Sequence, residues 1–444
     1  MSMENIIMEW EKEYINKVKK MSDVLEYIKS DIRIVVGHAA GEPQYLLEEL
    51  VKNSRDCSNV EIVHMISLNK SGYLNHHKKF RHNSFFAGSS TRGFINKGLA
   101  DYTPSFFYKI PELFNENLPI DIALIQTSLP DKDGFVSLGI SIDYTLEAAR
   151  KAKVVIAQLN ERMPYTLGDT KIHIKDIDVI IKKDEDILEL LPAELGEKEL
   201  KIGEYCSSLI SDGDTLQLGI GAIPDAVLAS LKNKKDLGIH SEMISDGVID
   251  LINSGVINNT KKNTFKGISI VSFIMGSKKL YNFVHNNPLI QLYPVSYVNN
   301  PIEIGKNDNV VSINSAIQVD LMGQVNAETI GENQFSGTGG QVDFIRGASF
   351  SKNGKSIIVL PSTAKNGEIS RIVCHLDKGS AVTTTRNDVD YIVTEYGIAK
   401  LKGKTLRERA LELIKISHPK FKNELYSYYH KKFNLIGGGN EITR

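Results

Sequence analysis

The sequence predicts an α/β protein made of two doubly wound, open-sheet α/β domains, residues 1–190 and 191–444. Three observations support this class. The length of 444 residues exceeds what one hydrophobic core usually organises. Short apolar runs typical of buried strands alternate with segments of helical periodicity, as a parallel sheet requires. One order of motifs also occurs twice, once in each half of the chain.

The first half begins with a segment to Lys29 that reads as helical. A strand at 32–36 follows, then the loop 37–42, and Pro43 opens the apolar helix QYLLEELV. Proline suits a first helical turn because its φ is fixed and its missing N–H has no partner there anyway. Later runs predict buried strands at 60–65, 120–126 and 154–158, with a helix at 144–151.

The second half repeats the order helix, aspartate, strand, glycine, short loop, glycine, proline, helix. Its helix lies around Cys206–Ile210, its strand at 215–218, and Pro224 is expected at the first position of the next helix. The repeat suggests an internal duplication, and a chance likeness of two strand–helix units is the alternative. Further strands are expected at 237–241, 268–273, 310–313, 356–360 and 391–394, followed by a helix at 406–416.

Two stretches are expected to lack regular structure. The acidic stretch 182–198 contains Pro192 and Gly196 and predicts the boundary between the domains. The glycine-containing tail after Phe433 is expected to fray.

Composition excludes several functional classes. A formal net charge of -1 gives no reason to expect nucleic acid or an anionic membrane as partner. Three cysteines, Cys57, Cys206 and Cys374, without a CxxC pair, argue against a disulfide framework or a zinc site. Residues 1–20 are too charged for a secretory leader, and the apolar run 268–275 is too short to span a bilayer. We therefore expect a cytoplasmic protein of enzyme size.

The turn Gly219-Ile220-Gly221-Ala222 is a candidate anion-binding loop, because helix N-termini present free N–H groups to anions. Such glycines also occur in turns that bind nothing. Glu242 follows the next short strand, where α/β enzymes display functional groups, and it is the candidate nucleophile. His240, Ser241 and Ser245 are expected to hold it in position. The alternative is a solvated surface glutamate.

A second glycine cluster, FSGTGGQVDF at 335–344, can bring backbone N–H groups against a phosphate or a developing oxyanion. Gln341 and Asp343 place polar atoms beside it, and a structural hairpin is the alternative. The cluster 88–93 and Lys365 offer cations for an anionic ligand, or else lie in exposed loops. The chain contains no HExxH, GxSxG, Walker A or complete GxGxxG motif, so metalloprotease, α/β-hydrolase, P-loop and Rossmann functions have no motif support.

Several long motifs, in order, resemble the acetyl-CoA hydrolase/CoA-transferase family, most closely its 4-hydroxybutyrate and butyryl-CoA:acetate CoA-transferases. The motifs in the second half are GIGAIPDAVL (219–228), HSEMISDGVIDL (240–251), QFSGTGGQVDFIRGASFS (334–351) and TTTRNDVDYIVTEYGIAKLKGK (383–404). STRG at 90–93 and PDKDGFVSLGISIDYT at 130–145 extend the resemblance over nearly the whole chain.

The resemblance implies two α/β domains with the active site in the cleft between them, in a homodimer or larger assembly. It implies that Glu242 is the catalytic glutamate, which forms a glutamyl-CoA thioester. The residues that match the family's CoA-contacting and oxyanion-binding positions are Gln217, Leu218, Gly219, Ile220, Gly221, Gly339, Gly340 and Lys365.

The implied activity is ping-pong transfer of CoA between short-chain acids (4-hydroxybutyrate or butyrate and acetate), as in fermentation. CoA is then both substrate and covalent intermediate, and neither a metal nor a tightly bound cofactor is expected. A short-chain acyl-CoA hydrolase on the same scaffold and a non-catalytic CoA-binding protein are the alternatives. The first domain is expected to supply the acyl pocket, with candidates His38, Gln44, Ser67, Asn69, Ser90 and Arg92.

Overall fold

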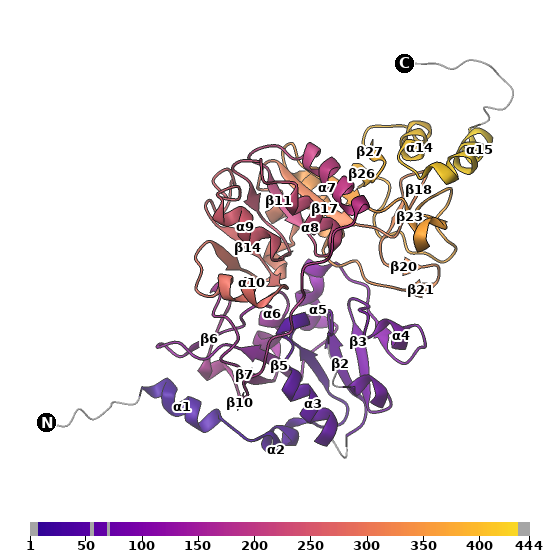
Figure 1. Ribbon diagram of the computed structural model, residues 1–444. Helices are drawn as coiled ribbons and strands as arrows, with labels where there is room; N and C mark the ends of the chain where they lie inside the picture. Colours follow the sequence, from indigo (N-terminus) through magenta and orange to yellow (C-terminus); the bar gives the residue numbers. More distant parts are fainter. Residues whose placement is uncertain (1–7, 54–56, 69–71, 434–444) are drawn as a thin grey trace.

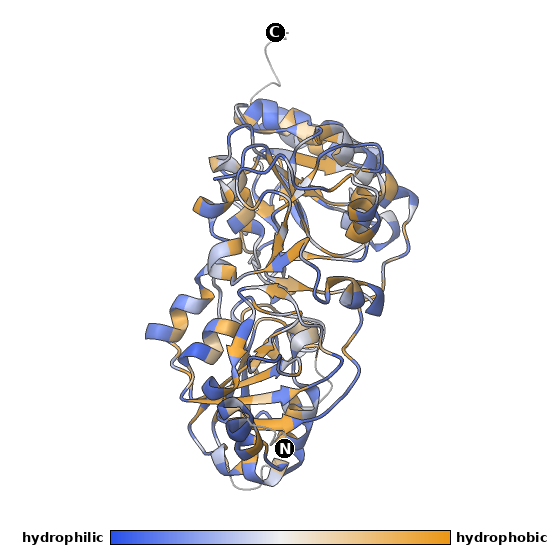
Figure 2. Ribbon diagram, turned by 90° about the vertical axis from the view of Figure 1, so that its left-hand side faces the viewer, coloured by the Kyte–Doolittle hydropathy of each residue, from blue (hydrophilic) through white to orange (hydrophobic). Residues whose placement is uncertain are grey.

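The computed structural model describes residues 8–53, 57–68 and 72–433, and it confirms an α/β fold built on two mainly parallel sheets. In Figure 1 the first half of the chain forms the lower part of the molecule and the second half the upper part. Figure 2 shows apolar residues concentrated on the strands and hydrophilic residues on the outer faces of the helices. The parallel sheets are therefore buried on both faces, as parallel sheets generally are.

The first sheet has seven strands, all parallel, in the order β10-β7-β5-β1-β2-β3-β4. Its strands are β1 (Arg33–Val36), β2 (Val60–His64), β3 (Phe80–Ser84), β4 (Asp101–Tyr102), β5 (Ile122–Thr127), β7 (Val154–Leu159) and β10 (Val179–Lys182). The helices of this half are α1 (Glu9–Lys17), α2 (Met21–Val24), α3 (Gln44–Asn53), α4 (Arg92–Ile95), α5 (Ile110–Glu116) and α6 (Thr145–Lys151).

The second sheet has six strands in the order β12-β11-β17-β22-β26-β27, and only the β26–β27 hairpin is antiparallel. Its strands are β11 (Thr215–Leu218), β12 (Gly238–Ile239), β17 (Val310–Ser315), β22 (Lys355–Val359), β26 (Tyr391–Thr394) and β27 (Gly397–Lys400). The helices of this half are α7 (Glu197–Leu209), α8 (Ala222–Ala229), α9 (Gly247–Asn253), α10 (Lys278–Val284), α11 (Val295–Val298), α12 (Pro301–Ile304), α13 (Gln341–Phe350), α14 (Leu406–Lys415) and α15 (Lys422–Lys432).

The two sheets share one topology. The order β2-β1-β5-β7-β10 in the first corresponds to β12-β11-β17-β22-β26 in the second. In the first sheet β1 lies between β2 and β5, and in the second sheet β11 lies between β12 and β17. The strand order reverses at β1 and at β11, and ligands of open α/β sheets bind at such switch points. This match favours internal duplication over coincidence.

Short strand pairs and one continuous core join the halves. β8 (Leu167–Gly168) of the first half pairs with β16 (Ile290–Leu292), which pairs with β14 (Ser269–Val271). The largest apolar cluster extends from Val35 in β1 to Val393 in β26. The other short strands are β6 (Phe135–Ser137) with β9 (Lys171–His173), β13 (Met243–Ile244) with β15 (Phe273–Ile274), β18 (Gln318–Asp320) with β19 (Val325–Asn326) and β25 (Ile372–Val373), β20 (Thr329–Ile330) with β21 (Asn333–Gln334), and β23 (Thr363–Ala364) with β24 (Ile369–Ser370).

Some expected elements differ in extent. Helix α8 begins at Ala222, so Pro224 is its third residue; the missing N–H costs nothing there either, because the first turn has no partners for these groups. The run 268–273 is two strands, β14 and β15, and the strand expected at 237–241 contracts to β12. The tail after Phe433 lies outside the described residues.

Residues 183–196, all of them described, contain no helix or strand. The boundary predicted at residue 190 falls in this stretch and stays a prediction. Within the described ranges, no helix combines the length and apolar character needed to cross a bilayer.

Candidate active site

Glu242 lies just after β12, beside the carboxyl end of β11. Its backbone carbonyl accepts the N–H groups of Ser272 (2.9 Å) and Phe273 (3.2 Å). The preceding Ser241 bridges to β11: its Oγ donates to the Leu218 carbonyl (3.1 Å) and accepts the Leu218 N–H (3.3 Å). The nucleophile candidate and the first glycine loop are therefore fixed to the same strand end.

Two donors face the Glu242 carboxylate. Asn299, which caps the C-terminus of α11, donates from Nδ2 to Glu242 Oε2 at 2.7 Å. The backbone N–H of Gly340, at the start of α13, also hydrogen-bonds this carboxylate. A methyl group on Gly340 would lie 1.8 Å from Glu242 Oε2 and 2.3 Å from Asn299 Nδ2. Only glycine fits this position.

A buried pair from the first half, His38 and Asp143, lies near Glu242. His38 Nδ1 is 3.1 Å from Asp143 Oδ2, and both side chains are fully buried. Asp143 also accepts hydrogen bonds from Ser141 Oγ (2.7 Å) and the Tyr144 N–H (2.6 Å). The His38 ring packs 4.6 Å from that of Phe273, whose N–H binds Glu242. The described residues offer no partner for His38 Nε2.

Burial determines the charge state of Glu242. It raises the pKa of this carboxyl group to about 7, with a further rise from Asp143, while the Asn299 hydrogen bond, His38 and the Gly340 N–H act in the opposite direction. A desolvated carboxylate that ionises near neutral pH is typical of a catalytic group.

The first glycine loop borders the same site. Gly221 caps α8 with φ 107°, a conformation that side chains rarely adopt, and is exposed. A cavity of about 100 Å³ is lined jointly by Ile220 and Gly221 of this loop and by Ser245 and Asp246 of the turn after Glu242. The loop therefore borders a cavity that it shares with the turn after Glu242, and Glu242 itself does not line this cavity.

Gln217 and Ser245 have structural partners. The amide of Gln217 exchanges hydrogen bonds with Asn314 in β17, at 3.0 and 3.2 Å. Ser245 binds Asp225, and His240 binds the Val298 carbonyl and Asn307. The expectation that His240 and Ser245 hold the Glu242 side chain is therefore wrong, because each has a different partner.

The second glycine loop connects the halves. A methyl group on Gly337 would lie 2.8 Å from the carbonyl oxygen of Phe85, so only glycine allows this approach. The Arg92 guanidinium stacks 4.0 Å from the centre of the Phe335 ring. Gly339 takes φ 53°, which turns the chain into α13 and places Gly340 at Glu242. Residues of the first half therefore position this loop.

The other candidates are more scattered. Lys365 is exposed, with φ 46° in a tight turn, and within the described ranges its side chain has no hydrogen bond or ion pair. Of the acyl-pocket candidates, His38 lies beside Glu242, Ser90 donates to the Ser67 carbonyl (2.6 Å), and Asn69 lies outside the described residues. No group of three or more potential metal ligands occurs among the residues described.

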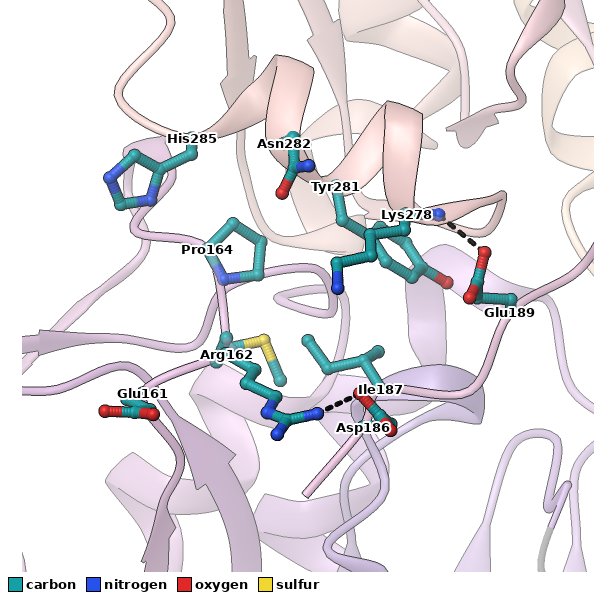
Figure 3. A pocket seen from close by; sticks show the side chains of 11 residues that line it. Glu161, Arg162, Pro164, Asp186, Ile187, Glu189, Lys278, Tyr281, Asn282 and His285 are labelled. Carbon is teal, nitrogen blue, oxygen red and sulfur yellow. Dashed lines mark hydrogen bonds and ion pairs between the residues drawn. The ribbon is translucent and has the colours of Figure 1, made fainter. Parts of the chain in front are cut away.

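A pocket of about 380 Å³, between the two halves, contains none of the predicted site residues (Figure 3). Two of its three acids are already engaged: Asp186 pairs with Arg162, and Glu189 accepts the backbone N–H of Lys278 at 2.7 Å. The Tyr281 hydroxyl donates to the Leu188 carbonyl (2.8 Å). This pocket lacks the convergent free groups that surround Glu242.

Sequence reasoning missed two residues of this site: Asn299, which binds Glu242, and Asp143, which binds His38. Asn299 lies in the run YVNNP, where asparagine before proline is typical of a helix start and carries no catalytic signal. Asp143 lies within a quoted motif, but nothing in the spacing places it on His38. Both contacts join residues far apart in the chain.

Comparisons with known proteins identify the relatives of this chain. The acetyl-CoA hydrolase/transferase N-terminal domain model matches residues 3–192, and the C-terminal domain model matches residues 276–429. A 4-hydroxybutyrate coenzyme A transferase of Clostridium kluyveri is 58% identical over 96% of this chain and 100% of that protein. A butyryl-CoA:acetate CoA-transferase of Anaerostipes caccae is 34% identical over 94% of this chain and 97% of its own length. The crystal structure of a 4-hydroxybutyrate CoA-transferase from Porphyromonas gingivalis has a TM-score of 0.84 and 42% identity, covering 96% of this chain and 100% of that one.

Proposed function

Because the chain belongs to the acetyl-CoA hydrolase/transferase family and is an enzyme of the CoA-transferase class, we propose that it moves CoA between short-chain acids: 4-hydroxybutyrate or butyrate and acetate. One observation carries the proposal. The carboxylate of Glu242 is partly buried, which raises its pKa to about 7, and both Asn299 and the Gly340 N–H donate to it. These are the requirements of a carboxylate nucleophile whose adduct must be stabilised.

The first half-reaction needs no net proton transfer. Glu242 attacks the thioester carbonyl through Oε1, since Oε2 is the oxygen held by Asn299. The carbon–sulfur bond breaks, and CoA leaves as a thiolate beside a mixed anhydride. The thiolate then attacks the side-chain carbonyl of Glu242, which expels the first carboxylate and leaves a glutamyl-CoA thioester. An incoming carboxylate reverses both steps with a new acyl group.

The donors on Oε2 have a specific task in this scheme. When the thiolate attacks the Glu242 carbonyl, negative charge develops on Oε2, the oxygen to which Asn299 Nδ2 donates, and the Gly340 N–H stabilises the negative charge of the same carboxyl group. An oriented donor of this kind contributes roughly 2.7–4 kcal/mol to a tetrahedral intermediate. We assign the other oxyanion, on the acyl carbonyl, to the N–H groups of the loop Gln217–Gly221.

The remaining parts of the proposal concern CoA and assembly. Gly339, Gly340 and Lys365 contact CoA, and binding energy from this remote moiety offsets the cost of positioning the reacting carbonyl. The active site lies in a cleft between domains 1–190 and 191–444, consistent with the first-half pair His38–Asp143 beside Glu242. The enzyme works in the cytoplasm as a homodimer or larger assembly, without a tightly bound cofactor.

Trapping the intermediate tests the mechanism. The enzyme is incubated with butyryl-CoA without acceptor, treated with hydroxylamine and analysed by peptide mass spectrometry. Modification at Glu242, absent from the Glu242→Gln variant, is expected. An unmodified Glu242 in an enzyme that exchanges CoA would overturn the proposal.

Acceptor dependence separates transfer from hydrolysis, in which water resolves the same intermediate. CoA release is measured with and without acetate. We expect release to depend on acetate; full turnover without it would favour the hydrolase. Comparing kcat/KM for 4-hydroxybutyrate, butyrate and propionate then defines the acyl preference, which overlaps because one methylene is worth only about 1–3 kcal/mol.

A further inference from the structure

The carboxyl group of Asp343 lies one hydrogen-bonding group away from the nucleophile. Asp343 is in the first turn of α13, three residues after Gly340, and its side chain is 1% exposed. Its Oδ2 accepts the backbone N–H of Tyr108 at 3.2 Å and lies 3.5 Å from Asn299 Nδ2. Asn299 Nδ2 therefore lies between two carboxyl groups, those of Glu242 and Asp343.

Two polar atoms in this cluster have no partner among the described residues: Asn299 Oδ1 and Asp343 Oδ1, both buried. An ionised Asp343 would leave both unsatisfied, since each could only accept a hydrogen bond. A neutral Asp343 carries a proton on Oδ1, which is the donor that Asn299 Oδ1 lacks. Protonation of Asp343 thus gives both buried oxygens a hydrogen-bond partner, and a buried polar atom without a partner costs free energy.

We propose that Asp343 is a positioning residue that acts as an uncharged carboxylic acid: it forms a cyclic acid–amide pair with Asn299 and so directs the other N–H of that amide at Glu242. In this pair Asp343 Oδ1–H donates to Asn299 Oδ1, and Asn299 Nδ2 donates to Asp343 Oδ2. The inference rests on the proposed function, because it assigns a role in orienting that nucleophile.

The surroundings favour the neutral form. Burial raises the pKa of Asp343 well above its usual range, and the Glu242 carboxylate raises it further. The Tyr108 N–H, Asn299 and Arg346 act in the other direction. Arg346 is itself engaged, stacking 5.1 Å from Phe106 and lying 3.6 Å from Asp388. Of the two carboxyl groups that contact the Asn299 amide, Glu242 carries the negative charge and Asp343 is neutral.

The same contacts connect the site to the first half. The N–H of Tyr108 belongs to the segment before α5, so Asp343 joins that segment to α13, to Asn299 and through it to Glu242. A neutral acid also avoids opposing the negative charge that develops on Glu242 Oε2 during thiolate attack. An ionised Asp343 would repel that charge.

Three variants test the proposal by their effect on kcat for CoA transfer. Asp343→Asn keeps the shape and the neutrality, because its Nδ2–H replaces Oδ1–H in the cyclic pair, and kcat within about threefold of the wild type is expected. Asp343→Ala removes both hydrogen bonds to Asn299, and kcat should fall ~10- to 100-fold with KM little changed. Asp388→Asn, which alters the partner of Arg346 and not the pair, is the matched control and should behave as the wild type.

The pH profile distinguishes positioning from a merely structural role. The wild type should lose kcat at alkaline pH as Asp343 ionises, and Asp343→Asn should lack this limb. At pH 8.5, where Glu242 is ionised, an infrared band of a protonated carboxylic acid should be present in the wild type and in Glu242→Gln, and Asp343→Asn should lack it. If Asp343→Asn is as impaired as Asp343→Ala, while melting temperatures show both folded, the residue acts as an anion and the inference is wrong.

The trapping experiment separates the two proposals. If the wild type forms no adduct at Glu242, the proposed function itself fails. If the adduct forms in the wild type but Asp343→Asn loses both activity and adduct, only the role given to Asp343 fails. If Asp343→Ala retains full activity, Asn299 needs no brace, and the inference fails as well.

Discussion

Replacing Glu242 by Gln should stabilise the fold at alkaline pH while abolishing CoA transfer. Burial raises the pKa of Glu242 from 4.5 to about 7. The folded state therefore favours the neutral form of the Glu242 carboxyl group. The neutral carboxyl group contributes its full free energy of unfolding below pH 4.5, and this contribution is lost as the pH rises through 7. Gln is neutral at every pH and has nearly the same shape, so it escapes this loss.

The magnitude follows from the size of the shift. A change from 4.5 to about 7 corresponds to about 3 kcal/mol of unfolding free energy once pH exceeds both values. For a chain of 444 residues, the usual unfolding entropy converts this to about 3 °C in Tm. Glu242→Gln should therefore melt about 3 °C above the wild type at pH 8.5, with a difference close to zero at pH 5.

Scanning calorimetry between pH 5 and 8.5 measures this difference. Glu194→Gln is the matched control, because Glu194 is exposed and within the described residues has no ion pair; its Tm difference should not change with pH. A Glu242→Gln difference that is equally independent of pH would refute the reasoning, because the Glu242 charge would then be as well solvated in the fold as in the unfolded chain.

Three further predictions concern activity. Because attack requires the ionised Glu242, kcat/KM should fall about tenfold per pH unit below pH ~7, and a profile flat to pH 5 would contradict the raised pKa. Gly340→Ala should abolish transfer, because its methyl group would lie 1.8 Å from Glu242 Oε2. The control Gly93→Ala, which has open space around the added methyl group, should keep its activity. Equal activities of the two variants would show that the site can accommodate a methyl group at Gly340. Lys365→Ala should raise KM for butyryl-CoA several-fold at nearly constant kcat, because a contact to the CoA moiety acts on ground state and transition state alike; an unchanged KM would remove Lys365 from the CoA site.

The fold was predictable because its signals are local. Runs such as Val60–His64 and Val154–Leu159 show their strands through apolar composition alone, and their alternation with helices predicts parallel sheets. The predicted ends of strands were less accurate where hydrogen bonds to other segments interrupt a strand whose residues favour β-structure. β12 ends at Ile239 because the residues that follow are bound by Leu218, Val298 and Ile270 rather than by a regular ladder.

The site was predictable only in part, for a physical reason. Glu242, Gly221 and Gly340 carry local signals, because strand ends and tight turns restrict which residue types fit. Asn299 reaches Glu242 across 57 residues, and Asp143 reaches His38 across 105. Contacts at such separations depend on how the sheets pack, which no local pattern encodes.

The duplicated topology identifies the counterpart of Glu242 in the first half. Ile34 of β1 pairs with Ile62 of β2, and Leu216 of β11 pairs with Ile239 of β12, so Met65 is the counterpart of Glu242. Met65 is buried, and its N–H already donates to the Tyr144 hydroxyl oxygen at 3.1 Å.

A second carboxylate at the Met65 position would add another buried charge to a region that already holds Asp143 at 0% exposure. Such a charge needs its own donors. The two halves differ at this position: the second holds one carboxylate with the donors Asn299 and Gly340, and the first holds the His38–Asp143 pair near it. In the proposed mechanism, the burial that raises the pKa of Glu242 to about 7 is also what makes its carboxylate reactive toward a thioester.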